Sequence, residues 1–425
     1  MPNTKEEERF SIRGGVPLSG TVQISGAKNA VLPAMAAALL TADECILENV
    51  PEIADIEIMA GVLRAMGAQV EWIGKGKVRL SAANIHTTVA PSEWVVRNRA
   101  SFLVMGPLLG RFHEAASCPP GGDVIGQRPF DVHLAGFRAL GAKITRQDDK
   151  YHATAAQLQG ARVFMDYPSH MGTENLMLAA VLAQGHTTIK NAAAEPEIGC
   201  LADLLNAMGA RISGTGSNTL EIEGVAELHG ARHTIISDRI EAGTFALAAA
   251  MTGGDVTLTA VDCDHLDALI WKLREAGAEV VEDNDTLRVR CSDWLNAVNV
   301  QALPYPGFAT DLQSAMGTVL TQAKGVSVLS ERVYDNRLLY VSELRKMGAE
   351  IVVAGQTAII SGPTHLIGTR VRALDIRCGA ALVLAGLRAQ GVTEVDDIWH
   401  LSRGYERIDE KLRGLGGQIT RVGGI

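Results

Sequence analysis

The sequence carries no excess of positive charge. Its 39 Lys and Arg residues are outnumbered by 48 Asp and Glu residues, which gives a formal net charge of -9 at pH 7. Proteins that bind nucleic acids generally present basic surfaces that neutralise phosphates. The charge balance therefore argues against a nucleic-acid partner, although it still allows a local basic site for a small anion.

Long apolar runs are also missing. Stretches such as residues 31–40 are shorter than the roughly 20 apolar residues that a helix needs to cross a bilayer. The first nine residues are polar and charged, unlike the apolar segment of a signal peptide. These features predict a cytoplasmic protein without a membrane partner.

The cysteines show no paired spacing. Six are scattered along the chain without a CxxC motif, at positions Cys45, Cys118, Cys200, Cys263, Cys291 and Cys378. Isolated cysteines in such a chain are typically reduced and buried. Metal-ligand spacing is absent as well, so we expect no metal site. No motif of the sequence implies an organic cofactor.

What the sequence does contain is a sixfold repeat. The pattern Leu or Phe, three variable residues, Gly and a small residue recurs about every 70 residues, a period that indicates a repeated structural unit. With 425 residues, the chain is long enough for at least two domains. The copies begin at Leu63, Phe137, Leu205, Leu273, Leu344 and Leu412.

Each repeat predicts a βαβαββ unit. An apolar helix, a short strand and a second helix precede the repeated Gly, which we expect to end that helix in a left-handed conformation. Two alternating strands follow. The sixth copy lacks its last strand, whereas a strand-like stretch starts at Arg9. We therefore predict that the two ends of the chain pair and complete the sixth unit.

The repeats predict an α/β protein with two lobes of three units each. Residues 27–236 would form a continuous lobe that carries a mobile loop at about 117–128. Residues 1–26 and 237–425 would form a discontinuous lobe, with two chain crossings near residues 26 and 236. A ligand cleft between the lobes is the expected site. A six-unit solenoid used for binding is the alternative.

Two segments of the continuous lobe carry candidate anion-binding groups. SGAKNA places Lys28 and Asn29 at the start of a helix, where anions are favoured; a solvated lysine is the alternative. PPGGDVIGQRPFD is rich in Gly and Pro and carries Asp123 and Arg128. This loop is either a mobile flap over an anion or a polar surface loop.

The discontinuous lobe offers an acid and several arginines. Asp311 in GFATDLQ lies near a predicted helix start, where it either takes part in chemistry or stabilises the helix dipole. Arginines occur at strand-to-helix junctions in both lobes. Together they suit a substrate with several negative charges, because guanidinium binds phosphate and carboxylate bidentately. They are Arg99, Arg337, Arg377 and Arg403.

The chain carries a series of motifs, which in order are SGAKNA, RAS, PGG-x-x-IG-x-RP, DRIE-x-GT, GF-x-TD, NR and RGYERI. Together they resemble the signatures of the UDP-N-acetylglucosamine 1-carboxyvinyltransferase family. The resemblance covers essentially the whole chain. It implies an inside-out α/β barrel in each lobe. It also implies transfer of the enolpyruvyl group of phosphoenolpyruvate to the 3-hydroxyl of UDP-N-acetylglucosamine, through a tetrahedral intermediate, with release of phosphate. This reaction is the first committed step of peptidoglycan biosynthesis.

The resemblance also implies residue roles. Asp311 would accept the hydroxyl proton or orient the hydroxyl, and Asp123 would serve in the loop. Lys28, Arg128 and Arg403 would clamp phosphoenolpyruvate, while Arg99 and Asn29 would hold substrate phosphate and sugar. Arg337 and Arg377 would organise the second lobe. The remaining implied substrate contacts are Pro129, Phe130, Asp131, Val132, Ser169, His170, Val333 and Asp375.

Two positions depart from the family pattern. Asp123 stands where the family commonly has Cys, so we predict that fosfomycin, which alkylates the Cys, does not inactivate this protein. SHMGTEN stands where SVGAT is frequent, which places His170 and Met171 near the expected diphosphate. A paralogous transferase for another nucleotide sugar, and a non-catalytic UDP-sugar sensor, are the alternatives. The oligomeric state stays open.

Overall fold

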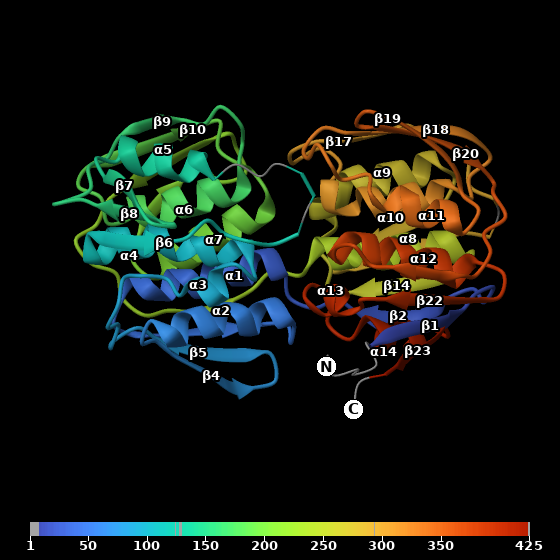
Figure 1. Ribbon diagram of the computed structural model, residues 1–425, viewed down its shortest axis with the longest axis horizontal. Coiled ribbons are helices and arrows are strands. Elements are labelled where there is room, and N and C mark those ends of the chain that lie inside the picture. Colours follow the sequence, from blue (N-terminus) through green and yellow to red (C-terminus); the bar gives the residue numbers. More distant parts are fainter. Residues whose placement is uncertain (1–7, 124, 127–129, 293, 424–425) are drawn as a thin grey trace. The chain divides into compact units, whose positions relative to one another are not determined.

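The computed structural model describes residues 8–123, 125–126, 130–292 and 294–423. These residues form two units, each described by itself (Figure 1). The Lys28 unit comprises residues 26–122 and 130–236. The Asp311 unit comprises residues 8–25, 123, 125–126 and 237–423. Asp123 groups with the Asp311 unit, in which it forms an ion pair with Arg403.

The Lys28 unit contains three described sheets with the strand orders β11-β12-β10-β9, β13-β3-β5-β4 and β6-β8-β7. Its strands are β3 (Glu44–Glu48), β4 (Gln69–Gly74), β5 (Lys77–Ser81), β6 (Glu114–Ser117), β7 (Lys143–Gln147), β8 (Lys150–Thr154), β9 (Arg162–Phe164), β10 (His186–Lys190), β11 (Arg211–Ser213), β12 (Thr219–Glu223) and β13 (Arg232–Thr234). Its helices are α1 (Lys28–Ala37), η1 (Ala38–Leu40), α2 (Ala54–Ala65), α3 (Ser92–Val95), η2 (Arg99–Val104), α4 (Met105–Phe112), α5 (Asp131–Ala139), α6 (His170–Ala180) and α7 (Pro196–Ala207).

The Asp311 unit contains three further described sheets, with the strand orders β21-β22-β1-β23, β15-β16-β14-β2 and β17-β18-β20-β19. Its strands are β1 (Arg9–Arg13), β2 (Ser19–Gln23), β14 (Asp255–Thr259), β15 (Glu279–Asp283), β16 (Thr286–Arg290), β17 (Val300–Ala302), β18 (Gly325–Glu331), β19 (Glu350–Ala354), β20 (Thr357–Gly362), β21 (Arg370–Arg372), β22 (Val392–Asp396) and β23 (Gln418–Val422). Its helices are α8 (Arg239–Thr252), η3 (Cys263–Leu266), α9 (Asp267–Glu275), α10 (Thr310–Leu320), α11 (Tyr340–Lys346), α12 (Ile376–Arg388), α13 (Trp399–Ser402) and α14 (Ile408–Gly414).

One repeat shows how each unit is built. In the third copy, β9 leads through α6 to β10, which pairs parallel with β9. Helix α7 follows, and β11 and β12 then form an antiparallel pair whose second strand pairs antiparallel with β10. The order βαβαββ predicted from the sequence is confirmed.

The repeated glycine ends the second helix of every copy. Gly67, Gly141, Gly209, Gly277, Gly348 and Gly416 all have positive φ angles, between 88° and 107°. The small residue after each Gly donates its backbone N–H to the carbonyl of the Leu or Phe that opens the pattern; in the first copy, Ala68 N lies 3.0 Å from Leu63 O. This is the Schellman arrangement, in which glycine avoids the steric penalty on a left-handed residue. The predicted left-handed helix ends are confirmed.

The N-terminal strand completes the sixth sheet. In β1, Phe10 lies opposite both Val395 of β22 and Arg421 of β23, and both pairings are antiparallel. This confirms the prediction that the two ends of the chain pair. Two edge strands also come from segments remote in the chain: β2 pairs parallel with β14, and β13 pairs parallel with β3.

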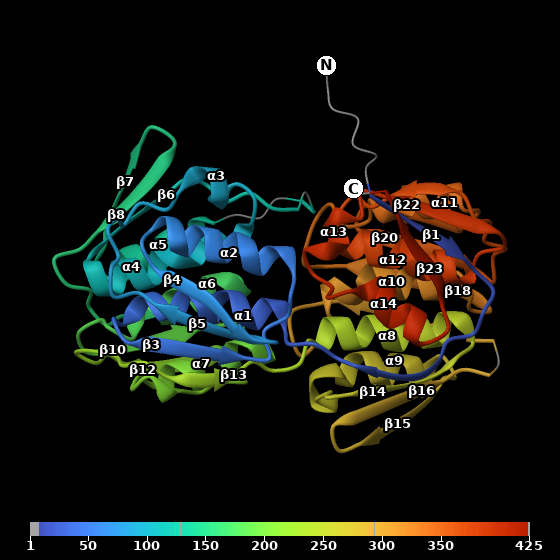
Figure 2. The same cartoon turned by 90° about the horizontal axis from the view of Figure 1, so that it is seen from below.

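The helices of each unit lie inside and the sheets outside, the inside-out arrangement expected from the sequence (Figure 2). In α8 every residue from Ile240 to Thr252 is buried, because small and apolar residues surround the whole helix. Close contact requires glycine: a Cβ on Gly243 would lie 2.5 Å from a methyl of Leu312 in α10. None of the described helices combines the length and apolar character that crossing a lipid bilayer requires.

Candidate active site

Asp311 lies in the first turn of α10 between two arginines. Its Oδ1 accepts a hydrogen bond from Arg337 Nη2 at 2.6 Å, and its Oδ2 accepts from Arg377 Nε at 3.0 Å and Nη2 at 2.7 Å. The two arginine side chains are 5% and 6% exposed, whereas Asp311 is 24% exposed. The structure therefore brings together three of the predicted site residues and leaves part of the carboxylate accessible.

The two arginines keep Asp311 ionised. Burial raises the pKa of this carboxyl, but the charges of Arg377 and Arg337 outweigh burial and hold its pKa well below the ordinary value. Asp311 is consequently a strong hydrogen-bond acceptor and a weak base. Of the two roles predicted for Asp311, this geometry suits the orienting role better than the proton-accepting role.

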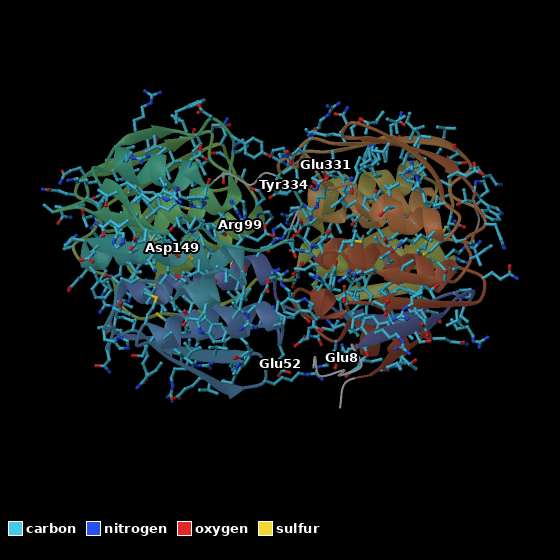
Figure 3. All side chains as sticks on the ribbon, in the orientation of Figure 1. Glu8, Glu52, Arg99, Asp149, Glu331 and Tyr334 are labelled. Atoms are coloured by element: carbon cyan, nitrogen blue, oxygen red, sulfur yellow. The ribbon has the colours of Figure 1, made fainter. Side chains whose placement is uncertain are left out.

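Glu331, at the end of β18, anchors the loop before Arg337. Its Oε1 accepts the backbone N–H of Val333 at 2.7 Å and of Tyr334 at 3.2 Å, and its Oε2 accepts Thr310 Oγ1 at 2.7 Å. Figure 3 labels Glu331 and Tyr334 in this loop. Val333 was a predicted contact, whereas Glu331 was not predicted. Segment 325–331 contains two serines besides its apolar residues, and the burial of its final acid is visible only in the structure. A buried acid requires partners.

Asp375 holds the first turn of α12. Its carboxylate accepts the backbone N–H of Arg377 at 2.8 Å and of Cys378 at 2.9 Å, as an N-cap residue does. The Arg377 guanidinium also lies over the ring of Tyr405, 5.3 Å from its centroid. Asp375 therefore fixes the backbone of Arg377, and Asp311 and Tyr405 fix its side chain.

Asp123 and Arg403 form an ion pair within the Asp311 unit. His400 Nδ1 lies 3.8 Å from the same Asp123 oxygen. Burial lowers the pKa of His400, against the opposing effect of Asp123, so the imidazole is neutral at pH 7. Arg403, which the sequence analysis assigned to the substrate, here has a carboxylate partner from the loop. Arg128 and Pro129 lie outside the described residues.

Lys28 is the first residue of α1 in the Lys28 unit. Its Nζ lies 2.7 Å from Oδ2 of Asp55, which is fully buried, and Asn29 follows with its side chain half-buried. The turn before the helix needs glycine, because a Cβ on Gly26 would lie 1.7 Å from the carbonyl oxygen of Asn49. Lys28 is therefore an oriented cation with a buried counter-ion.

The first turn of α6 combines a cap with a buried acid. Ser169 Oγ accepts the backbone N–H of Gly172 at 3.2 Å, and His170 Nε2 lies 3.7 Å from Glu174 Oε1. Burial raises the pKa of Glu174 to about 8; Glu197 and Glu195 add to this rise, and His170 opposes it. Glu174 is accordingly a neutral acid at pH 7.

The predicted uridine-binding residues surround the start of α5. Phe130 packs edge-on against Tyr151 and Phe102, with ring centroids 5.2 Å and 5.6 Å away. Asp131 is exposed and Val132 half-buried. Burial lowers the pKa of the neighbouring His133 to about 3, with a further contribution from the charge of Arg99, which Figure 3 labels.

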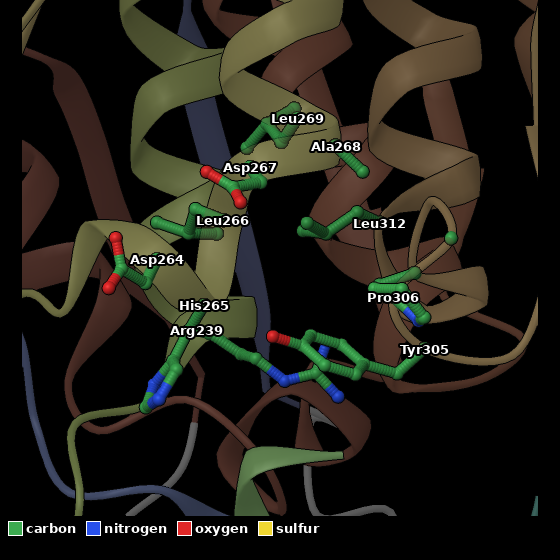
Figure 4. A pocket seen from close by; sticks show the side chains of 12 residues that line it. Arg239, Asp264, His265, Leu266, Asp267, Ala268, Leu269, Tyr305, Pro306 and Leu312 are labelled. Atoms are coloured by element: carbon green, nitrogen blue, oxygen red, sulfur yellow. The ribbon is translucent and has the colours of Figure 1, made fainter. Parts of the chain in front are cut away.

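A pocket lies within the Asp311 unit (Figure 4). Ala309 and Leu312, which flank Asp311 in the sequence, line the pocket, whereas Asp311 itself does not line it. The Arg239 guanidinium lies 5.6 Å from the centroid of the Tyr305 ring. The pocket therefore does not contain the Asp311 cluster, and the candidate site rests on the charged groups.

Comparisons with known proteins agree with the fold. Residues 12–412 match the family model of EPSP synthase (3-phosphoshikimate 1-carboxyvinyltransferase). Two solved structures share the fold. The enolpyruvyl transferase NikO from Streptomyces tendae has a TM-score of 0.89 and 24% identity, and the match covers 99% of this chain and 100% of that chain. EPSP synthase from Acinetobacter baumannii has a TM-score of 0.79 and 20% identity, and the match covers 98% of this chain and 100% of that chain.

Curated relatives give a narrower assignment. The chain is 53% identical over 417 residues to UDP-N-acetylglucosamine 1-carboxyvinyltransferase 2 of Carboxydothermus hydrogenoformans, covering 98% of this chain and 99% of the relative. It is 50% identical over 413 residues to UDP-N-acetylglucosamine 1-carboxyvinyltransferase 1 of Caldanaerobacter subterraneus, covering 97% and 99%. The chain belongs to the EPSP synthase family and, within it, to the UDP-N-acetylglucosamine 1-carboxyvinyltransferases.

Proposed function

We propose that this protein transfers the enolpyruvyl group of phosphoenolpyruvate to the 3-hydroxyl of UDP-N-acetylglucosamine and releases inorganic phosphate. The observation that carries the proposal is the Asp311 carboxylate held between Arg337 and Arg377 in a chain about half identical to named transferases of this kind. An ionised, partly accessible acceptor is what a sugar hydroxyl needs in order to be oriented as a nucleophile.

In the proposed reaction, the sugar oxygen forms a bond to C2 of phosphoenolpyruvate while C3 gains a proton and the hydroxyl loses one. The tetrahedral intermediate then loses a proton from C3 and breaks the bond between C2 and the phosphate oxygen. Asp311 would accept a hydrogen bond from the hydroxyl and align it. Because its pKa is well below the ordinary value, the hydroxyl proton would move late, as the oxygen bonds to C2.

The cations would bind the substrate anions. Lys28, Arg128 and Arg403 would bind the phosphate and carboxylate of phosphoenolpyruvate, where charge stabilisation is the main contribution to catalysis. Arg403 is paired with Asp123 in the free protein. A substrate anion would compete for this guanidinium and release Asp123, which could then exchange a proton with C3.

Most contacts to the nucleotide sugar would come from the continuous part of the chain, residues 27–236. Phe130, Asp131 and Val132, together with Pro129, would line the uridine site. Arg99, Ser169 and His170 would contact the diphosphate, and Asn29 the sugar; Val333 would border the sugar through its backbone, which Glu331 positions. The segments 1–26 with 237–425, and 27–236, would act as the two lobes.

The biological setting follows from this reaction. The protein would act in the cytoplasm, in the first committed step of peptidoglycan synthesis, and loss of its activity would impair cell shape and division. Asp123 in place of the alkylated Cys would make the reaction insensitive to fosfomycin.

The direct test measures phosphate release from phosphoenolpyruvate with and without UDP-N-acetylglucosamine. Release that requires the sugar supports the proposal. Release that requires a different sugar in a panel of nucleotide sugars would favour the second candidate, a paralogous transferase, for which His170 in the first turn of α6 is the motivating observation. No release with any nucleotide sugar would contradict both.

A further inference from the structure

Ser25 joins three segments of the Asp311 unit that are remote from one another in the sequence. Its hydroxyl donates a hydrogen bond to Glu406 Oε2 at 2.5 Å, and its backbone N–H donates one to Glu241 Oε2 at 2.7 Å. Its carbonyl oxygen accepts the backbone N–H of Asp238 at 2.8 Å. Every polar group of Ser25 is therefore bound either at the start of α8 or in the loop between α13 and α14.

Lys411 of α14 fixes the direction of the Ser25 hydroxyl. Its Nζ lies 2.7 Å from both Ser25 Oγ and Glu241 Oε1. An ammonium group only donates hydrogen bonds, so the Ser25 oxygen accepts from Lys411 and its single proton is directed to Glu406. The Glu241 side chain is 3% exposed, and such charge-assisted bonds are strong where water is excluded. The four groups therefore form one network with a defined direction for each bond.

The loop that contains Glu406 has a strained backbone. Arg407 has a φ of 46° and a ψ of 47°, a left-handed conformation that is unfavourable for a residue with a Cβ. Just before Glu406, the Tyr405 hydroxyl lies 2.9 Å from Thr244 Oγ1 of α8, and the Tyr405 ring contacts the Arg377 guanidinium. Strained backbone persists only where neighbouring contacts hold it. The bond from Ser25 is one of these contacts.

The network also touches two segments that carry predicted phosphoenolpyruvate ligands. Lys28 follows Ser25 by three positions, and Arg403 precedes Glu406 by three positions. The hydroxyl of Ser25 thus links the segment that leads to one cation with the loop that carries the other. A small displacement of a substrate-binding group can lower a reaction rate greatly, so the geometry of both segments matters for the bound anion.

We propose that Ser25, Glu406 and Lys411 are positioning residues for phosphoenolpyruvate. Their hydrogen bonds fix the segments that carry Lys28 and Arg403, and none of the three touches the substrate. The inference rests on the proposed function, because phosphoenolpyruvate is the anion that these cations would bind. Most contacts assigned to the nucleotide sugar lie on other segments, so loss of the network should affect phosphoenolpyruvate selectively.

The experiment measures phosphate release by the full chain while each substrate is varied at saturation of the other. Ser25→Ala should raise the KM for phosphoenolpyruvate about tenfold or more and change the KM for UDP-N-acetylglucosamine by less than about twofold. Thr188→Ala is the matched control. Its hydroxyl also donates to a carboxylate, at 2.7 Å from Glu221 Oε2, but β10 carries no predicted site residue. This control should leave both KM values unchanged.

Two further variants separate positioning from general stability. Ser25→Thr keeps the hydroxyl and should retain the wild-type KM for phosphoenolpyruvate. Glu406→Ala removes the same hydrogen bond from its other end, so the double variant with Ser25→Ala should raise this KM no further than the larger single effect. Glu406→Ala also provides the test if Ser25→Ala does not fold. Thermal unfolding checks that every variant is folded under the assay conditions.

The outcomes distinguish this inference from the proposed function. If the wild type releases phosphate in a sugar-dependent manner but Ser25→Ala keeps its KM for phosphoenolpyruvate, the positioning role alone is wrong. It is also wrong if Ser25→Ala raises both KM values equally, or if Thr188→Ala has the same effect. A wild type that releases no phosphate would overturn the proposed function and this inference with it.

Discussion

One oxygen of Asp311 receives both hydrogen bonds from Arg377, at 3.0 Å from Nε and 2.7 Å from Nη2. Arg377 thereby makes a side-on contact with Oδ2, while Oδ1 is held by Arg337. The two residues are separated by 66 positions in the sequence, and Asp375 fixes the backbone from which Arg377 extends. This relationship gives Asp311 its charge and its direction, and the first prediction concerns it.

Asp311→Asn should lower the rate of phosphate release by about 100-fold or more, because the amide is a weaker acceptor for the sugar hydroxyl. It should also leave the charges of Arg337 and Arg377 uncompensated, so Tm is measured alongside. Asp267→Asn is the control, since Asp267 likewise lies in the first turn of a helix but is exposed. Equal rates for both variants would remove Asp311 from the mechanism.

Glu174→Gln should stabilise the protein more at pH 8 than at pH 5. The pKa of Glu174 is raised to about 8 in the folded protein, whereas a Glu in the unfolded chain has a pKa of about 4.3. Between these values the folded state binds more protons than the unfolded state, so its stability falls as pH rises. The amide stays neutral and avoids this loss. Tm at the two pH values provides the measurement.

Glu223→Gln is the control for that comparison, because Glu223 is an exposed acid of the same unit. It should change Tm little at either pH. If the Tm difference between Glu174→Gln and wild type does not grow with pH, the conclusion that Glu174 is a buried neutral acid is wrong.

Asp123→Cys should render the protein sensitive to fosfomycin, whereas the wild type should keep its phosphate release during preincubation. At position 123 the wild type has a carboxylate that pairs with Arg403, and Cys118, the cysteine of this loop, is buried. Mass spectrometry checks the adduct. Time-dependent inactivation of the wild type with a covalent adduct on Asp123 is the result that would refute this.

Gly141→Ala should destabilise the Lys28 unit by about 1 kcal/mol. Gly141 has a φ of 93°, and a Cβ there would meet no atom within 4 Å, so backbone conformation alone accounts for the effect. Gly199→Ala is the matched control, because Gly199 lies within α7, has open space and shows no positive φ. Alanine should be neutral or stabilising there. Chemical denaturation monitored by circular dichroism measures both, and equal effects would contradict the Schellman explanation.

The sequence determined the repeated unit because its signals are local. A left-handed helix end needs glycine at one position, and strands need alternation, so six copies of the glycine pattern were sufficient to predict βαβαββ. The missing last strand of the sixth copy even predicted its replacement by the segment at Arg9, which Phe10 in β1 confirms. The resemblance to known signatures supplied the identity of the candidate residues.

The tertiary structure decided which of those residues meet and in what charge state. Arg337 and Arg377 follow Asp311 by 26 and 66 positions, and no local pattern links them. Glu331 and Asp55 escaped the sequence analysis because a buried carboxylate looks like any other acid until its partners are known. Ion pairing and burial depend on distances between segments remote in the chain, which sequence periodicity does not encode.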